Sequence, residues 1–259
     1  MSKPAVNPVN QLGRRLRQSN SPSQEDLEQL GEIVEMSGFT LDIVERQLRL
    51  LGLDLTTRLK NTFTIIEKLK REPSLQLSKI HDLAGARIHR DMTLDEQDEI
   101  VSRITQIWPD ARVKDRRIFP THGYRAVHVI VGLDGRFVEV QVRTHYQHIW
   151  AQATESLGDL WGRGIRYGGA PEEPDRRVSD QHSLTRRELI EAWKDKSNDF
   201  HGLAVLENKV SRIRTRIPMI QDVEERSAEE HTVEELVGEI TVSFNSDRRI
   251  LEALSRVLR

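Results

Sequence analysis

Apolar positions recur at helical spacing near both ends of the chain and alternate with polar positions in its middle. Apolar residues three and four apart form the buried stripe of an amphipathic helix. This spacing predicts helices over about 24–36, 40–51 and 58–71, with Gly38 as the break between the first two. Residues 1–23 are rich in proline, asparagine, serine and arginine, and this composition predicts a flexible basic arm.

The clearest strand pattern lies on either side of Asp134-Gly135, where the segments 124–133 and 136–144 both alternate. An Asp-Gly pair between alternating segments is typical of a two-residue β-hairpin. In that register one face of the hairpin carries only valines, which predicts that this face is buried. The other face carries five polar or aromatic residues: Tyr124, His128, Glu139, Gln141 and Arg143.

Shorter strand patterns at 86–90 and 111–118 are interleaved with helical ones, and residues 183–259 are mainly helical. This mixture predicts an α+β fold, with a mixed central β-sheet flanked by helices and with helical extensions at both ends. After the arm, we divide the chain into one domain over 24–165 and a C-terminal helical extension over 166–259.

Composition excludes several classes of protein. The 259 residues include no cysteine, so a disulfide scaffold, a thiol nucleophile and a cysteine-ligated metal are excluded. No apolar run approaches the roughly 20 residues that cross a membrane. The N-terminus lacks the apolar segment of a secretory signal. We therefore expect a cytoplasmic protein without a membrane-spanning part.

The polar face of the hairpin has an unusual composition. A solvated sheet face is the ordinary explanation for polar residues on one side of an antiparallel pair. Such a face is usually built from Lys, Thr and Glu, whereas this one combines an aromatic ring, an imidazole, a carboxylate, an amide and a guanidinium. That set favours a site that stacks a ring, binds phosphate and holds a metal or activates a hydroxyl.

Two further clusters carry candidate chemistry. Residues 58–71 hold five basic residues and one acid, and Lys60, Thr64 and Lys68 are four residues apart, which predicts one shared helix face suited to a polyphosphate. Asp82 precedes a turn and is a candidate ligand for Mg²⁺, which prefers oxygen ligands. Considered one at a time, these features are better explained by a solvated helix face and by a turn-capping aspartate.

Four motifs in order carry a resemblance to a known family: RLKNTFTIIEKLKR (58–71), DLAGARI (82–88), GYRAVH (123–128) and VEVQVRT (138–144). Together they resemble the synthetase domain of the RelA/SpoT alarmone synthetases over about residues 40–165. The resemblance implies a nucleotidyltransferase-like fold. It also implies an enzyme, a pyrophosphokinase that moves the β,γ-pyrophosphate of ATP to a ribose 3′-hydroxyl.

The resemblance also implies roles on the ATP side. Arg58 and Arg87 would sandwich the adenine, and Lys60, Thr64 and Lys68 would hold the triphosphate.

Other residues would bind the metal and the acceptor. Asp82 and Glu139 would be the catalytic carboxylates that bind Mg²⁺, with Glu139 activating the acceptor hydroxyl. Tyr124 would stack on the acceptor base. Three residues would support the acceptor and its phosphates: His128, Gln141 and Arg143.

The acceptor itself stays open, because Thr121 stands where many family members have a lysine before the GYR motif. GDP or GTP would give the alarmone (p)ppGpp. The 3′-CCA adenosine of tRNA would instead make the protein a growth-arresting toxin, and ATP or ADP is a third option. An antitoxin or a separate hydrolase, and a homo-oligomer, are conceivable partners. A second reaction, nucleotidyl transfer, is disfavoured because the sequence lacks the paired-Asp motif that is usual for it. A non-catalytic nucleotide- or RNA-binding module is the alternative of another class.

Overall fold

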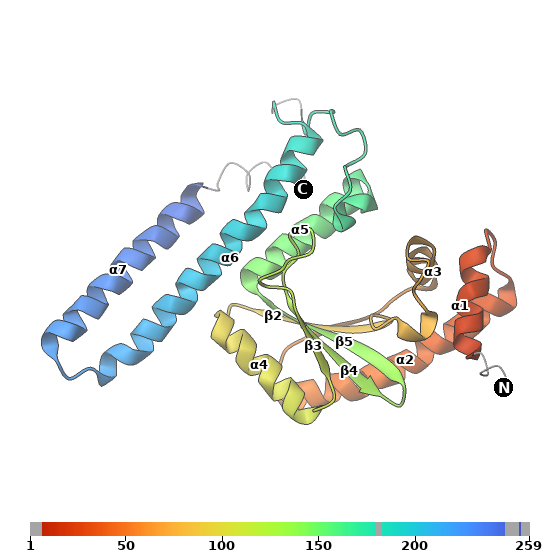
Figure 1. Cartoon of the computed structure of the whole chain (residues 1–259), viewed down its shortest axis with the longest axis horizontal. Helices are drawn as coiled ribbons and strands as arrows, with labels where there is room; N and C mark the ends of the chain where they lie inside the picture. Colours follow the sequence, from red (N-terminus) through yellow and green to blue (C-terminus); the bar gives the residue numbers. More distant parts are fainter. Residues whose placement is uncertain (1–6, 180–182, 247–253, 255–259) are drawn as a thin grey trace, which may run out of the picture. The chain divides into compact units, whose positions relative to one another are not determined.

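The computed structural model describes residues 7–179, 183–246 and Leu254. Five strands form one sheet with the hydrogen-bonded order β1-β2-β5-β4-β3 (Figure 1). The strands are β1 (Thr56–Leu59), β2 (Ala84–Arg90), β3 (Arg112–Asp115), β4 (Val127–Leu133) and β5 (Arg136–Thr144). The α-helices are α1 (Pro8–Gln18), α2 (Gln24–Leu50), α3 (Thr62–Arg71), α4 (Leu94–Ile107), α5 (His145–Trp161), α6 (Arg186–Arg216) and α7 (Val223–Ser246). The predicted α+β fold with a mixed sheet and flanking helices is confirmed.

The chain divides into two compact units that interleave along the sequence. The first comprises residues 1–89, 101–114 and 128–142, and the second comprises residues 90–100, 115–127 and 143–259. These units do not follow the expected division after residue 165. None of the helices in the described part of the chain is long and apolar enough to cross a membrane.

Helix α1 lies within the segment that was expected to be a flexible arm, so that prediction is wrong for residues 8–18. Asn7 caps the helix by accepting a hydrogen bond from the Val9 amide at 2.9 Å. Leu12 and Leu16 are buried in a core shared with α3 and with the 3-10 turn Leu77–Lys79. The apolar stripe of α1 is only two turns long, and its burial depends on contacts with residues far along the chain.

Helix α2 is continuous through Gly38, so the predicted break is wrong. Gly38 lies where the helix meets β1, and a Cβ there would approach the Leu59 side chain at 3.2 Å. The third predicted helix begins at Thr62 rather than at 58, since Asn61 caps it and Arg58 belongs to β1. Packing of α2 against β1 outweighs the low helix propensity of a single glycine.

The hairpin of β4 and β5 has the predicted two-residue turn. Asp134 and Gly135 both have positive φ, of 48° and 75°, as a type I′ turn requires. Strand β4 begins at Val127 rather than at 124, because the segment before it forms a separate tight turn. The valine face is buried as predicted, with at most 1% exposure for Val127, Val129, Val131, Val138, Val140 and Val142.

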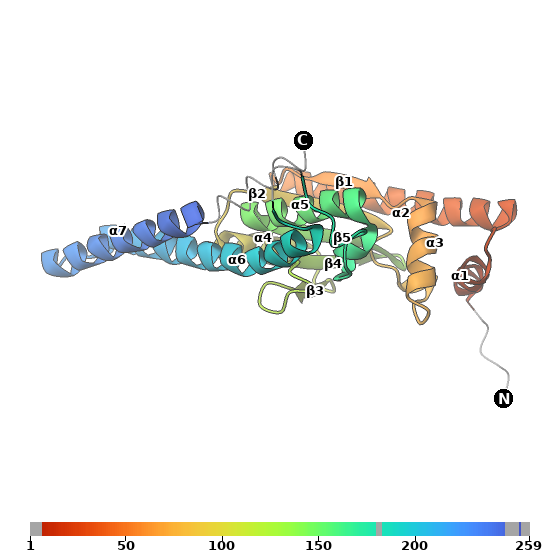
Figure 2. The same ribbon diagram turned by 90° about the horizontal axis from the view of Figure 1, so that it is seen from above.

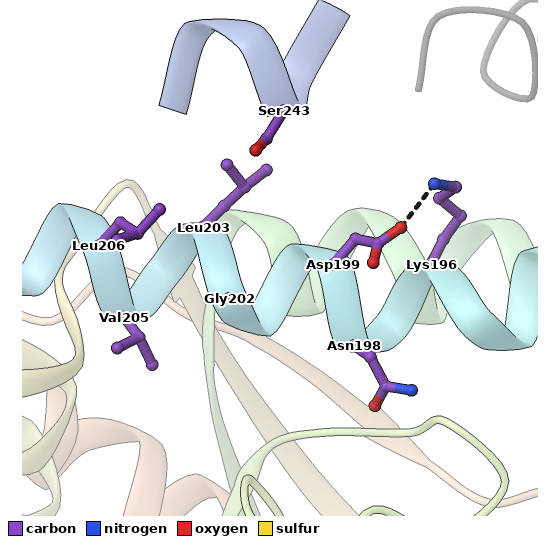
Figure 3. A pocket seen from close by; sticks show the side chains of 8 residues that line it. All are labelled: Lys196, Asn198, Asp199, Gly202, Leu203, Val205, Leu206 and Ser243. Carbon is purple, nitrogen blue, oxygen red and sulfur yellow. Dashed lines mark hydrogen bonds and ion pairs between the residues drawn. The ribbon is translucent and has the colours of Figure 1, made fainter. Parts of the chain in front are cut away.

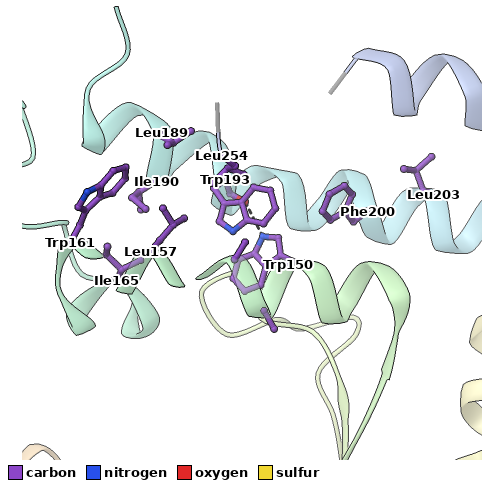
Figure 4. Packing of buried hydrophobic residues seen from close by; sticks show 12 residues of the cluster. Trp150, Leu157, Trp161, Ile165, Leu189, Ile190, Trp193, Phe200, Leu203 and Leu254 are labelled. Carbon is purple, nitrogen blue, oxygen red and sulfur yellow. Dashed lines mark hydrogen bonds between the residues drawn. The ribbon is translucent and has the colours of Figure 1, made fainter. Parts of the chain in front are cut away.

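The second unit contains a helical core in which α6 lies beside both α5 and α7 (Figures 1 and 2). The rings of Trp150 on α5 and Trp193 on α6 stack with their centroids 6.2 Å apart (Figure 4). The Trp150 indole N–H also donates to the Trp193 carbonyl at 2.9 Å. This pair fixes the register of α6 against α5.

Candidate functional site

Asp82 accepts a charge-assisted hydrogen bond on each of its carboxylate oxygens. The Lys60 Nζ lies 2.6 Å from Oδ2, and the Lys68 Nζ lies 2.8 Å from Oδ1. Lys60 directly follows β1, and its amide donates to the Leu83 carbonyl at 2.8 Å, which continues the β1–β2 ladder. Two cations from different elements therefore converge on the aspartate that the sequence singles out.

These three charges are only one-fifth exposed. Burial raises the pKa of Asp82, but the neighbouring Lys60 and Lys68 ammonium groups outweigh it and hold the pKa well below its ordinary value. Burial also lowers the pKa of Lys60, against the opposing effect of Asp82. Asp82 is thus ionised at neutral pH, as a metal ligand must be.

Arg58 and Arg87 lie on the same face of the β1–β2 pair. The two strands are antiparallel, with Arg58 opposite Gly85 and Thr56 opposite Arg87, so the two arginines are diagonal neighbours. At Gly85 a Cβ would lie 3.6 Å from the Glu139 carbonyl and 3.9 Å from the Arg58 side chain. The structure thus brings together the two arginines expected on either side of an adenine.

Thr64 lies in the first turn of α3, one turn before Lys68. Its amide donates to the Asn61 Oδ1, and its hydroxyl donates to the Asn61 carbonyl, both at 2.9 Å. Lys60 precedes the helix, so the predicted single helix face of Lys60, Thr64 and Lys68 is wrong. The two lysines nevertheless meet, because both reach Asp82.

Glu139 is held by two neighbours on the polar face of the hairpin. Its Oε1 lies 2.9 Å from the His128 Nδ1, and its Oε2 accepts from the Gln141 amide at 3.0 Å. Burial raises the pKa of Glu139, but the hydrogen bonds from His128 and Gln141 outweigh it and lower the pKa to about 2. Since an ionised carboxylate only accepts, the His128 Nδ1 carries the donated proton.

Asp82 and Glu139 fit a hard divalent cation. Both are ionised carboxylates, and the negative charge of Asp82 acts on the pKa of Glu139. Within the described residues, no cluster of three or more His, Cys, Asp or Glu side chains could hold a metal ion. Two carboxylates suit Mg²⁺, which keeps several waters and takes its remaining ligands from substrate phosphates.

Tyr124 and Arg143, both in the second unit, form a stacked pair. The Arg143 guanidinium lies 5.0 Å from the ring centroid of Tyr124, and its Nη2 donates to the tyrosine hydroxyl at 2.9 Å. Arg143 is only 2% exposed, so most of its side chain is enclosed by protein. Its clearest effect is therefore to hold the tyrosine ring.

His81, the residue before Asp82, was not among the side chains predicted from the sequence. Its ring meets the Phe137 ring edge-on at 4.7 Å, and its Nε2 lies 2.9 Å from the Arg112 Nη2. Burial and the Arg112 charge lower the pKa of His81. Adjacency to Asp82 was the one sequence signal for this histidine, because Arg112 and Phe137 are distant along the chain.

The fold and these side chains define a class of protein: an α+β domain with two ionised carboxylates, one of which is bridged by two lysines. Residues 57–157 match the family described as a region found in RelA / SpoT proteins. This match confirms the resemblance to RelA/SpoT proteins for residues 57–157. The small alarmone synthetase 2 from Bacillus subtilis is similar in fold, with a TM-score of 0.52 and 21% identity over 71% of this chain and 98% of that chain.

Sequence relatives extend the match beyond that region. Uncharacterized proteins of Mycobacterium tuberculosis (strain ATCC 25618 / H37Rv) and of Mycobacterium bovis are each 39% identical over 146 residues. The match covers 56% of this chain and 52% of each relative, so the chain spans about half the length of the curated relatives it matches.

Proposed function

We propose that the protein is an ATP-dependent pyrophosphokinase whose acceptor is the ribose 3′-hydroxyl of GDP or GTP, with (p)ppGpp as product. The observation that carries this proposal is the pair of ionised carboxylates within the RelA/SpoT region. Asp82 is bridged by two lysines, and Glu139 is fixed by His128 and Gln141. Phosphoryl transfer asks the protein mainly for positioning and charge neutralisation, which these groups supply.

The ATP side uses groups of the first unit. When the triphosphate binds, Lys60 and Lys68 exchange the Asp82 carboxylate for phosphate oxygens, and the Thr64 hydroxyl and the start of α3 add donors. Arg58 and Arg87 enclose the adenine by stacking and cation–π contact. Bound Mg²⁺ would neutralise phosphate charge, with Asp82 and Glu139 as its protein ligands.

Glu139 orients the attacking hydroxyl. The acceptor 3′-oxygen bonds to the β-phosphorus of ATP, the bond from that phosphorus to the α,β-bridging oxygen breaks, and AMP leaves. The hydroxyl proton passes to Glu139 and then to solvent. With a pKa of about 2, Glu139 is a weak base, so it acts chiefly by accepting the hydrogen bond that aligns the nucleophile. Because the transition state of phosphoryl transfer is loose, alignment of the nucleophile is the main contribution that this residue has to make.

Tyr124 holds the acceptor base on the ring face opposite Arg143.

A nucleotide is favoured over tRNA because many basic side chains of the C-terminal half are already paired with acids. Arg186 pairs with Glu173 at 3.1 Å, and Arg212 pairs with Asp95 at 2.6 Å. An RNA surface needs a basic stripe that remains available to phosphates.

The test is product identification with purified protein, Mg²⁺ and γ-labelled ATP, with GDP, GTP, ATP and bulk tRNA as separate acceptors. We expect label in the guanosine tetra- and pentaphosphates. Label in RNA would show that the same reaction uses tRNA as its acceptor. Absence of label from all four acceptors, in a protein that binds ATP, would overturn the proposal.

Replacing His128 with alanine is expected to move the acid limb of the pH–activity profile upward by about 1 to 2 units. The substitution removes a hydrogen bond that lowers the pKa of Glu139, so the carboxylate protonates at higher pH. The profile of kcat at saturating substrates measures this shift. His145→Ala, an exposed histidine at the start of α5, is the control and should leave the limb in place. An unchanged limb in the His128 variant would show that Glu139 does not control it.

A further inference from the structure

A tight turn presents Tyr124. The Tyr124 amide donates to the Thr121 carbonyl at 3.0 Å, and His122 and Gly123 both have positive φ, of 53° and 87°. These values define a type I′ turn, which favours glycine at its central positions. At Gly123 a Cβ would lie 2.6 Å from the Trp150 ring, so the turn is seated directly on α5.

One hydroxyl of α6 bonds to both residues that flank Tyr124. Ser197 is 2% exposed, and its Oγ donates to the Gly123 carbonyl. The same oxygen accepts from the Arg125 Nε at 3.1 Å. Ser197 is more than 70 residues away along the chain, and the proposed transfer step does not use it.

Arg125 is anchored to the same turn of α6. It is 7% exposed, and its Nη2 donates to the Asn198 Oδ1 at 2.7 Å. Burial alone lowers its pKa, and no carboxylate in the described part of the chain pairs with it. A buried guanidinium without an acidic partner is costly. Its hydrogen bonds to Ser197 and Asn198 offset part of this cost and hold the guanidinium in one position.

Helix α6 is itself anchored to α5. The stacked Trp150 and Trp193 rings hold it against α5, the same helix that seats Gly123 (Figure 4). Asn198 and Leu203 of α6 line a groove of about 620 Å³, and Ser243 of α7 lines the same groove (Figure 3).

We propose that Ser197 is a positioning residue for the acceptor nucleotide. It fixes the backbone on both sides of Tyr124, and through it the orientation of the ring that stacks on the acceptor base. The inference rests on the proposed function, because it assigns Tyr124 to the acceptor. It adds that helix α6 determines how well the acceptor binds.

Ser197→Ala is expected to raise KM for GDP about tenfold, with KM for ATP and kcat at saturating GDP changed less than about twofold. Hydrogen exchange of the amides over 121–126 should become faster, while exchange in β5 stays unchanged. Ser211→Ala, the same substitution about four helical turns further along α6, is the matched control and should leave both measurements at wild-type values.

A second variant covers the case in which Ser197→Ala fails to fold. Asn198→Ala removes only the outer hydrogen bond to Arg125, and we expect the same changes at smaller size. Unchanged KM for GDP with unchanged exchange over 121–126, or equal losses in both KM values, would overturn the inference. If the wild-type protein uses none of the acceptors, the proposed function fails, and faster exchange at the turn alone would then support only the anchoring by Ser197.

Discussion

Glu139→Gln is expected to reduce pyrophosphate transfer by at least about 10³-fold while the protein stays folded. Glutamine has nearly the size and shape of glutamate, but it cannot take the hydroxyl proton and is a poor ligand for Mg²⁺. The lost charge therefore removes the proposed metal ligand and proton acceptor, and it weakens the hydrogen bond that aligns the 3′-hydroxyl. Initial rates with GDP or GTP under saturating ATP measure the loss.

The surroundings of Glu139 make this substitution mild for the fold. A glutamine Oε1 still accepts from His128, and only the bond from the Gln141 amide is lost. We expect a loss of about 1 kcal/mol in the free energy of unfolding, measured by denaturant titration. Glu99→Gln, an exposed position on α4, is the matched control and should keep full activity. A folded Glu139→Gln protein that retains more than one-tenth of the activity would contradict the role of Glu139.

The hairpin shows what local sequence can predict. Alternation gives the buried valine face, and Asp134-Gly135 gives the turn, because strand period and turn chemistry depend on neighbouring residues. The same hairpin register predicted that His128, Glu139 and Gln141 lie on one face. The structure joins these three side chains by hydrogen bonds.

Contacts between distant segments set the features that sequence could not predict. Leu16 shows no long stripe around it, yet it is fully buried against residues of another helix. Lys60 and Lys68 were expected to meet along one helix, whereas they meet at Asp82. Ser197 has no sequence signal at all, since a serine within a helix becomes informative only when its partner Gly123 is known.

Asp82→Asn is expected to reduce transfer by at least about 10³-fold and to change how ATP binds. In the wild-type protein the carboxylate holds both Lys60 and Lys68 and is also a proposed ligand of Mg²⁺. Asparagine releases the two lysines from a negative charge, so metal-free ATP should bind several-fold more tightly than to the wild type. The gain in ATP affinity from added Mg²⁺ should shrink, as calorimetric titration with and without chelator will measure.

The same variant has a pH signature in stability. The pKa of Asp82 is lowered in the folded protein, so its carboxylate contributes stability above its ordinary pKa of 3.8 and loses it as the pH falls through the lower folded value. At neutral pH we expect Asp82→Asn to lower the free energy of unfolding by about 1 to 3 kcal/mol. The reason is that the neutral amide leaves two close ammonium groups without a counterion. The difference from the wild type should narrow steadily below pH 3.8.

Asp110→Asn, an exposed aspartate in the same unit, is the control for Asp82→Asn and should change neither ATP binding nor stability. Asp82→Asn could instead weaken the binding of metal-free ATP. That result would mean that Asp82 helps ATP binding by positioning the two lysines more than it opposes binding by neutralising their charge. If Mg²⁺ still improves ATP affinity as much as in the wild type, Asp82 is not a metal ligand, and Glu139 alone would have to bind the ion.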